Sequence, residues 1–207
     1  MKLYYSSTSP YARKVAIVAI ETGHEAAIER LAAAPHPIDR DAQVVAANPL
    51  GKVPTLVTDD GLTLFDSRVI AEYLDAHTRR RRVFPAEGPA RWTALTQQSL
   101  GDGLLDAALL IRYEQTARPA EHRWDLWQQR QFDKIGSALA RIEEWSPALT
   151  PDLTIGTITL GCALGYLDLR FPDYNWRAAH RGAADWFAAV SAHPSLEATR
   201  APQPLAA

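Results

Sequence analysis

Short apolar runs alternate with helical periodicity over roughly the first 80 residues of the chain. Two of these runs, residues 54–59 and 62–66, flank Asp60-Gly61, a dipeptide that favours the tight turn of a β-hairpin. The expected elements are strands at 2–5, 27–31, 54–59 and 62–66, and helices at 10–22 and 67–76. This order of strands and helices is typical of a small α/β domain.

Beyond residue 90 the pattern is helical to the end of the chain. Apolar side chains keep helical spacing clearly between Trp124 and Ile142, and less regularly in 95–113 and 175–191. The segment 77–90 carries four arginines, two prolines and a glycine, and is interpreted as a solvated connector rather than a nucleic-acid patch. The sequence therefore predicts an α/β domain over 1–78, a linker over 79–88 and an all-helical domain over 89–207.

Composition and charge narrow the class of protein. The 207 residues are 47% hydrophobic and 22% charged, which is enough to bury a full core. The formal net charge of −2 provides no field that would attract nucleic acid or an anionic membrane. Cys162 is the single cysteine, which excludes an internal disulfide and a multi-cysteine metal site and fits a reducing compartment. No apolar signal region follows Met1, so a cytoplasmic protein is expected. Together with the charge and the cysteine count, this predicts no metal, membrane or nucleic-acid partner.

Four hydroxyl residues stand together in front of Pro10. They fall between the first expected strand and the first helix, and Pro10 suits the first helical turn because its missing N–H costs nothing there. Ser9 is therefore the expected N-cap, a role that contributes about 1 kcal/mol. Alternatively, a hydroxyl at a helix N-terminus can stabilise a bound anion together with the helix dipole. This stretch alone favours simple capping.

Two further junctions offer polar groups at the ends of expected strands. Pro54 stands at a strand entry, a position that proline tolerates. If the Val53-Pro54 bond is cis, which the sequence leaves open, the Val53 N–H and C=O turn toward a ligand backbone. Asp66 and Ser67 fall at a strand-to-helix junction, where either could simply cap the helix. Three such junctions on one small domain indicate a pocket for a small, peptide-like, anionic ligand.

These stretches carry a family resemblance. "SPYARKV" (9–15), "NPLGKVPTL" (48–56) and "DSRVIAEYL" (66–74) resemble, in order and separation, the N-terminal domain of cytosolic glutathione S-transferases. The segment 170–199 is similar to the closing part of the same family, so the resemblance covers nearly the whole chain and is nearest to the bacterial, serine-bearing branch. It implies a thioredoxin-like α/β N-terminal domain, an all-α C-terminal domain and a homodimer.

The resemblance also implies a glutathione site. Ser9 takes the position where a hydroxyl faces the glutathione sulfur, with Ser7 as the competing choice. A valine backbone would pair with the cysteinyl part, an acidic-serine pair would hold the γ-glutamyl end, and two basic residues would meet the glycine carboxylate. The residues implied for these contacts are Lys52, Val53, Pro54, Asp66, Ser67 and His36.

The same residues limit the reaction. Dithiol exchange needs two cysteines at the start of the helix, whereas residues 9–12 read Ser-Pro-Tyr-Ala, so this chemistry is excluded there. Conjugation of glutathione to a small, apolar electrophile is therefore the expected activity. Arg112 and Tyr113 are candidates for the acceptor pocket, and Tyr11 is a candidate for lining the thiol site. The alternatives are glutathione-dependent reduction of peroxides or disulfides, and a non-catalytic binding or regulatory module with the same fold.

Two positions depart from the family pattern. Thr157 stands where the family usually has the aspartate of a helix-capping box, so the reciprocal bond back to Thr154 is expected to be weak or absent. Gly156 and Gly161 lower the helix propensity of this stretch further. Asp66 stands where glutamate is commoner, and its shorter reach would weaken glutathione binding.

Overall fold

The computed structural model describes residues 1–201, and the chain divides into two compact units. Unit 1 comprises residues 1–91 together with the segment that starts at Ala198, and unit 2 comprises Trp92–Glu197. Within the described part of the chain, no helix is long and apolar enough to cross a membrane.

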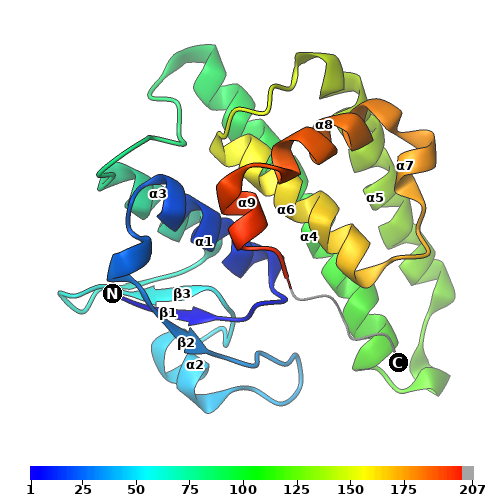
Figure 1. Ribbon diagram of the computed structural model, residues 1–207. Coiled ribbons are helices and arrows are strands. Elements are labelled where there is room, and N and C mark those ends of the chain that lie inside the picture. The colour runs from blue at the N-terminus through cyan, green and yellow to red at the C-terminus, as the bar shows by residue number, and fades with distance from the viewer. Residues whose placement is uncertain (202–207) are drawn as a thin grey trace. The chain divides into compact units, whose positions relative to one another are not determined.

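Unit 1 is built on a four-stranded mixed sheet with the strand order β2-β1-β3-β4 (Figure 1). Strand β1 pairs in parallel with β2 and antiparallel with β3, which pairs antiparallel with β4. The strands are β1 (Lys2–Tyr5), β2 (Glu29–Ala32), β3 (Thr55–Val57) and β4 (Thr63–Leu64). The predicted α/β unit is confirmed.

Two helices, α1 (Pro10–Glu21) and α3 (Ser67–Ala76), pack against each other on one side of the sheet, and the short helix α2 (Ala42–Ala47) lies on the other (Figure 1). Residues 15–19 of α1 are all buried because the run Val-Ala-Ile-Val-Ala presents small and branched apolar side chains on most of the helix surface. The core of the unit includes Leu3, Val15, Ile17, Leu56, Ile70 and Leu74. This core holds the strand ends and helix starts in fixed positions.

Some boundaries differ from those predicted. Strand β2 starts at Glu29 because residues 25–27 form a 3₁₀ turn. Strands β3 and β4 are shorter than expected because the Thr58 hydroxyl accepts the Leu62 amide at 2.9 Å and closes the hairpin early. Helix α2 was not predicted. Asp41 caps it by accepting the amides of Gln43 and Val44 at 3.0 and 3.3 Å.

The connector after α3 is only partly solvated, in contrast to the sequence interpretation. Val83 and Phe84 are buried, and both their amides donate to the Asp75 carboxylate at 2.6 and 3.2 Å. Asp75 also faces Arg82 across a 3.5 Å ion pair. The basic run is therefore attached to unit 1 at its C-terminal end.

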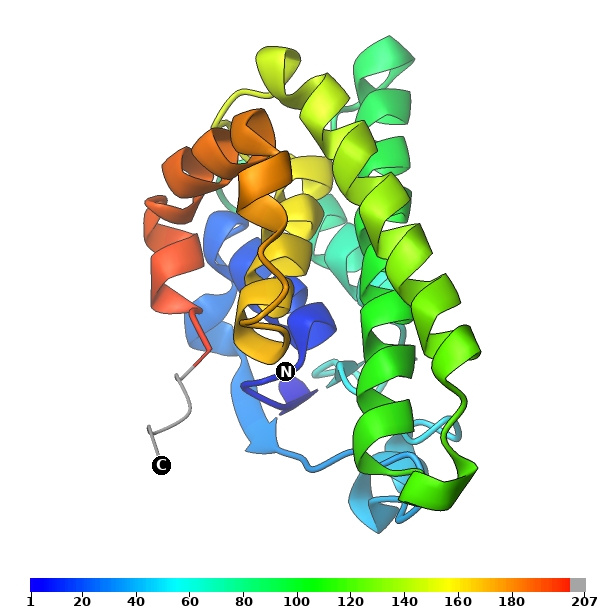
Figure 2. The same ribbon diagram turned by 90° about the vertical axis from the view of Figure 1, so that its right-hand side faces the viewer.

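The rest of the described chain is helical, which confirms the all-α second domain (Figure 2). The helix predicted over 175–191 is broken at His180 into two. The helices are α4 (Gly88–Thr116), α5 (Asp125–Trp145), α6 (Ile155–Arg170), α7 (Trp176–Ala179), α8 (Arg181–Ser191) and α9 (Pro194–Ala198).

Gly156 at the start of α6 and Gly101 in α4 allow the two helices to pack closely. A Cβ atom at Gly156 would lie 2.4 Å from the Gln97 side-chain oxygen, and one at Gly101 would lie 2.9 Å from the Thr159 methyl carbon. The two glycines therefore lower the helix propensity of their segments but let the helices approach closely.

The capping box at the start of α6 is present, so the expectation that its reciprocal bond would be weak or absent was wrong. The Thr154 hydroxyl accepts the Thr157 amide at 3.2 Å, and the Thr157 hydroxyl accepts the Thr154 amide at 2.8 Å. A threonine hydroxyl can act as the acceptor here because the same oxygen donates its proton to the Asp152 carbonyl at 2.9 Å.

Candidate functional site

The pairing of the sheet brings the three predicted junctions to one edge of unit 1. Tyr4 pairs with Thr55, so the chain leaves β1 beside the point where it enters β3. Leu56 pairs with Leu64, so the chain leaves β4 toward the same edge. The loops that carry Ser9, Val53-Pro54 and Asp66-Ser67 therefore share this edge.

Ser9 is the N-cap of α1, as predicted. Its hydroxyl oxygen accepts the Ala12 amide at 3.2 Å, and its own amide donates to the Ser6 carbonyl at 3.0 Å. Within the described residues the Ser9 hydroxyl donates to no acceptor, so its proton is available to a ligand. The first turn of α1 contains no acidic residue, and this helix end favours an anion. Ser7, the competing candidate, is exposed and does not cap the helix.

The Val53-Pro54 peptide bond is cis, the isomer that the sequence alone left open. Val53 and Pro54 are buried at the entry to β3. The Val53 amide and carbonyl make no hydrogen bond to other described residues, and they are thus available for backbone pairing with a ligand.

Asp66 and Ser67 start α3, after a second cis peptide bond between Phe65 and Asp66. One carboxylate oxygen of Asp66 accepts the Arg68 amide at 2.9 Å, so the simple capping role considered from the sequence is present. The second oxygen is left for another donor. Ser67 is only 2% exposed, and its hydroxyl has no hydrogen-bond partner among the described residues.

Asn48, a buried residue that the sequence interpretation overlooked, organises the loop in front of Val53. Its side-chain amide donates to the Lys52 carbonyl at 3.1 Å and to the Thr55 hydroxyl at 3.0 Å. Its side-chain oxygen accepts the Leu50 amide at 3.0 Å. The available signal was an asparagine directly before a proline, which is typical of a structured turn.

The two basic candidates for a carboxylate are both exposed. No hydrogen bond or ion pair occupies the Lys52 ammonium group among residues 1–201. His36 lies in the loop after β2, and its Nδ1 accepts the amides of Ile38 and Asp39 at 3.3 and 3.0 Å. Because Nδ1 is the acceptor, the proton of the neutral ring lies on Nε2, which is directed away from these amides.

The remaining candidates lie on helices. Tyr11, in the first turn of α1, is half-buried. Arg112 and Tyr113 lie on α4 in unit 2, and burial raises the pKa of the Tyr113 phenol. Cys162 is 1% exposed on α6, as expected for a core thiol. The structure gives no group of three His, Cys, Asp or Glu residues, within its described range, that could hold a metal ion.

Comparison with known proteins agrees with this geometry. Residues 8–77 match the family model for the glutathione S-transferase N-terminal domain, and residues 125–189 match that for the C-terminal domain. An uncharacterized GST-like protein of Escherichia coli strain K12, YibF, is 35% identical over 179 residues, which are 85% of this chain and 86% of that protein.

Two crystal structures of a glutathione transferase family member from Pseudomonas fluorescens Pf-5 are also similar. One, with bound glutathione, is 42% identical with a TM-score of 0.94, and the match covers 97% of this chain and 98% of that one. The other, with bound S-(propanoic acid)-glutathione, is 41% identical with a TM-score of 0.89, and the match covers 98% of this chain and all of that one.

Proposed function

Because the chain belongs to the glutathione S-transferase family, we propose that it is a glutathione transferase that joins the thiolate of glutathione to a small electrophile. The observation that carries this proposal is the Ser9 hydroxyl, a half-buried donor at the start of α1 without an acceptor in the described protein. In the reaction the sulfur forms a bond to carbon, and the acceptor either expels a leaving group with its electron pair or takes up a proton.

The energetics of thiol ionisation suit this site. A free thiol has a pKa of about 8.5, and only the thiolate is a good nucleophile. Lowering the thiol pKa by about two units requires about 2.7 kcal/mol of preferential stabilisation of the anion. A hydrogen bond to a charged group contributes about 1.5 to 3 kcal/mol, and a helix N-terminus about 0.3 to 1 kcal/mol. The Ser9 hydroxyl at the start of α1 therefore meets the requirement without a general base.

The other loops of the shared edge would hold the rest of glutathione. Asp66 would accept the γ-glutamyl amino group, and Ser67 would bind the γ-glutamyl carboxylate. The free amide and carbonyl of Val53, before Pro54, would pair with the cysteinyl backbone. Lys52 and His36 would meet the glycine carboxylate. The glutathione bound in a 42% identical structure supports glutathione as the thiol ligand.

Conjugation is favoured over disulfide exchange on a protein thiol. Cys162 is buried in α6 and is the chain's single cysteine, so the protein offers no accessible thiol for a mixed disulfide. Peroxide or disulfide reduction would therefore have to use glutathione thiols alone.

We further propose that the protein is a homodimer. Unit 1 exposes four large apolar side chains, Ile38, Leu50, Leu62 and Val69, at 65%, 61%, 50% and 47%. A dimer would cover such side chains. Sedimentation equilibrium should give twice the chain mass for the wild type, and a Leu62→Glu, Val69→Glu double variant should shift the distribution toward the monomer.

The activity is tested by titrating the protein calorimetrically with glutathione and by following the absorbance of the bound thiolate between about pH 5 and pH 9. Saturable binding with a thiol pKa below about 8.5 is expected, and Ser9→Ala should raise this pKa by about one to two units. Ser7→Ala is the matched control and should leave the pKa at the wild-type value. If millimolar glutathione does not bind, the transferase proposal is wrong; if only Ser7→Ala raises the pKa, Ser9 is not the donor.

A further inference from the structure

Helices α4 and α6 of unit 2 run in parallel and in close contact (Figures 1 and 2). Their register is set where Gly156 meets Gln97 and where Gly101 meets Thr159. About three helical turns beyond the second contact, α4 reaches Arg112 and α6 reaches Arg170. Continued along both helices, this register brings Arg112 and Arg170 to corresponding positions.

Two tyrosines belong to the same cluster. Tyr166 lies one turn before Arg170 on α6, is 5% exposed, and is near enough to Arg170 for the guanidinium charge to act on its ionisation. Tyr113 and Arg112 are near enough to Tyr166 to act on its ionisation. Burial raises the pKa of both phenols, so both remain protonated hydrogen-bond donors at neutral pH.

The positive charge of this cluster is not neutralised within the described protein. Neither Arg112 nor Arg170 forms an ion pair with a described acid, and the buried Nε of Arg170 has no hydrogen-bond partner there. A buried donor without an acceptor is costly, and burial of an unpaired cation more so.

Neighbouring carboxylates on the same helices are already engaged. Glu114 accepts Arg118 at 2.7 Å and the Trp124 amide at 2.9 Å. Asp168 accepts Arg177 through both oxygens at 2.6 Å. Neither of these two acids serves the cluster as its counter-ion.

We propose that Arg112, Tyr113, Tyr166 and Arg170 form a binding site for the carboxylate of the acceptor substrate. A carboxylate accepts several hydrogen bonds at once, and guanidinium groups match its planar geometry better than any other side chain. The preferred acceptors are then acidic electrophiles rather than purely apolar ones. This inference rests on the proposed transferase function, whose glutathione site lies on other residues.

The test compares two acceptors that differ at one ring position, where one carries a carboxylate and the other its neutral amide: 4-chloro-3-nitrobenzoate and 4-chloro-3-nitrobenzamide. In both, the glutathione sulfur bonds to the ring carbon, chloride leaves with the electron pair, and the thiol proton goes to solvent. After correction for the uncatalysed rates, kcat/KM for the benzoate should exceed that for the benzamide by about tenfold, equivalent to about 1.4 kcal/mol. The ratio should fall to about one in Arg112→Gln and Arg170→Gln.

Control variants separate this effect from general changes in charge or packing. Arg141→Gln removes an exposed arginine of α5 that pairs with Glu144 at 2.9 Å, and it should keep the wild-type ratio. Tyr166→Phe keeps the buried ring but removes the hydroxyl, and it should lower the ratio severalfold. Equal ratios in the wild type and both cluster arginine variants would overturn the inference.

An equilibrium measurement tests the site without glutathione. Calorimetric titration with 3-nitrobenzoate should show binding that Arg112→Gln and Arg170→Gln weaken by about tenfold, while 3-nitrobenzamide should bind more weakly to the wild type. If glutathione fails to bind but this discrimination is found, the transferase proposal fails and the anion site stands. If glutathione binds and the two nitro compounds bind alike, only the anion site is refuted.

Discussion

The side-chain amide of Asn48 donates a 3.1 Å hydrogen bond to the backbone carbonyl of Lys52, across the loop that precedes Val53. Asn48 is 1% exposed, and its other contacts, to Leu50 and Thr55, join the start of this loop to strand β3. One buried side chain thus sets the path of the backbone that would pair with glutathione.

Replacing Asn48 by alanine should weaken glutathione binding without changing the thiolate chemistry. The Lys52 carbonyl loses one donor, and the loop before Val53 becomes less well ordered. We expect the Kd for glutathione to rise about tenfold and the free energy of unfolding to fall by about 1 to 3 kcal/mol. The pKa of the bound thiol should stay at its wild-type value, because Ser9 is unchanged.

The measurements are calorimetric titration with glutathione and urea denaturation. Gln43→Ala, at an exposed position on α2, is the control and should leave both quantities unchanged. A thiol pKa in Asn48→Ala that moves as far as in Ser9→Ala would contradict a positioning role.

The threonine capping box of α6 makes a separate prediction about stability. Thr157→Val keeps the shape of the side chain but removes the hydroxyl that accepts the Thr154 amide and donates to the Asp152 carbonyl. The free energy of unfolding should fall by about 1 to 2 kcal/mol. Thr157→Ser retains the hydroxyl and should lose less than half of this amount in the same urea titration. Equal losses in the two variants would mean that packing, not capping, stabilises the helix start.

Local sequence signals were sufficient where a segment's own residues determine its structure. Helix α3 occupies the predicted range because Asp66 caps it and apolar residues repeat at helical spacing. Ser9 and Pro10 marked the start of α1 in the same way. The order of strands and helices, with the family motifs, also gave the fold of both units.

Signals failed where the outcome depends on a specific side-chain contact that the local pattern of residue types does not contain. The Val83 and Phe84 amides are held by Asp75, so a segment read as solvated is anchored. The cluster around Tyr166 and Arg170 needs the register of two helices, which no local pattern contains. The role of Asn48 depends on the folded path of its own loop, which brings the Lys52 carbonyl to its side-chain amide.

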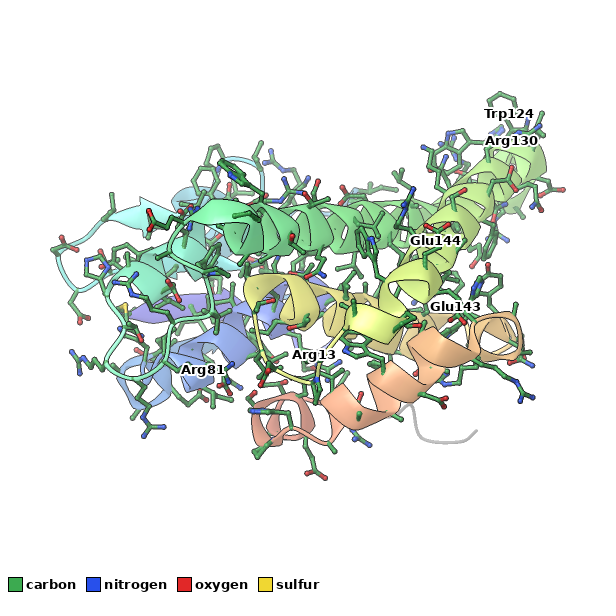
Figure 3. All side chains as sticks on the ribbon, turned by 90° about the horizontal axis from the view of Figure 1, so that it is seen from above. Arg13, Arg81, Trp124, Arg130, Glu143 and Glu144 are labelled. Carbon is green, nitrogen blue, oxygen red and sulfur yellow. The ribbon has the colours of Figure 1, made fainter. Side chains whose placement is uncertain are left out.

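Glu143 stabilises the start of a helix from a different part of the chain. Glu143 lies near the end of α5 (Figure 3). Its two carboxylate oxygens accept the amides of Gly182 and Ala183, at 3.0 and 2.7 Å, and both donors belong to the first turn of α8. The hydrogen bond from Ala183, followed by that from Gly182, lowers the pKa of the Glu143 carboxyl. The lowered pKa means that the folded state favours the ionised group.

Glu143→Gln should therefore destabilise the protein at neutral pH by about 1 kcal/mol, because the amide offers one acceptor where the carboxylate offers two. The carboxylate's contribution is fully present above its unfolded-state pKa of about 4.3 and is lost as the pH falls through the lower folded-state pKa. The difference from wild type should shrink accordingly at acid pH in urea titrations. Glu144→Gln, at the next position in an exposed ion pair with Arg141, is the control and should cost less than about half as much.

His24 should make the protein sensitive to mildly acidic pH. The residue is 4% exposed, and its Nδ1 lies 2.9 Å from the Thr22 hydroxyl. That hydroxyl already donates its proton to the Val18 carbonyl at 2.7 Å, so Nδ1 must carry the proton of the neutral ring. Burial, followed by the charge of Arg79 and a smaller contribution from His77, lowers the pKa of His24, although a backbone hydrogen bond at His77 acts in the opposite direction.

The sign of the pH dependence follows from that lowered pKa. Below the unfolded-state pKa of about 6.5 the unfolded chain binds a proton at His24 that the folded state does not, so the free energy of unfolding falls as the pH decreases toward the folded-state pKa. The slope is at most about 1.4 kcal/mol per pH unit. In urea titrations between about pH 7.5 and pH 5.5, wild type should lose stability more steeply than His24→Gln, which cannot titrate. His122→Gln, at an exposed position, should follow the wild-type slope, and a His24→Gln slope equal to the wild-type slope would show that the folded state accommodates the protonated ring.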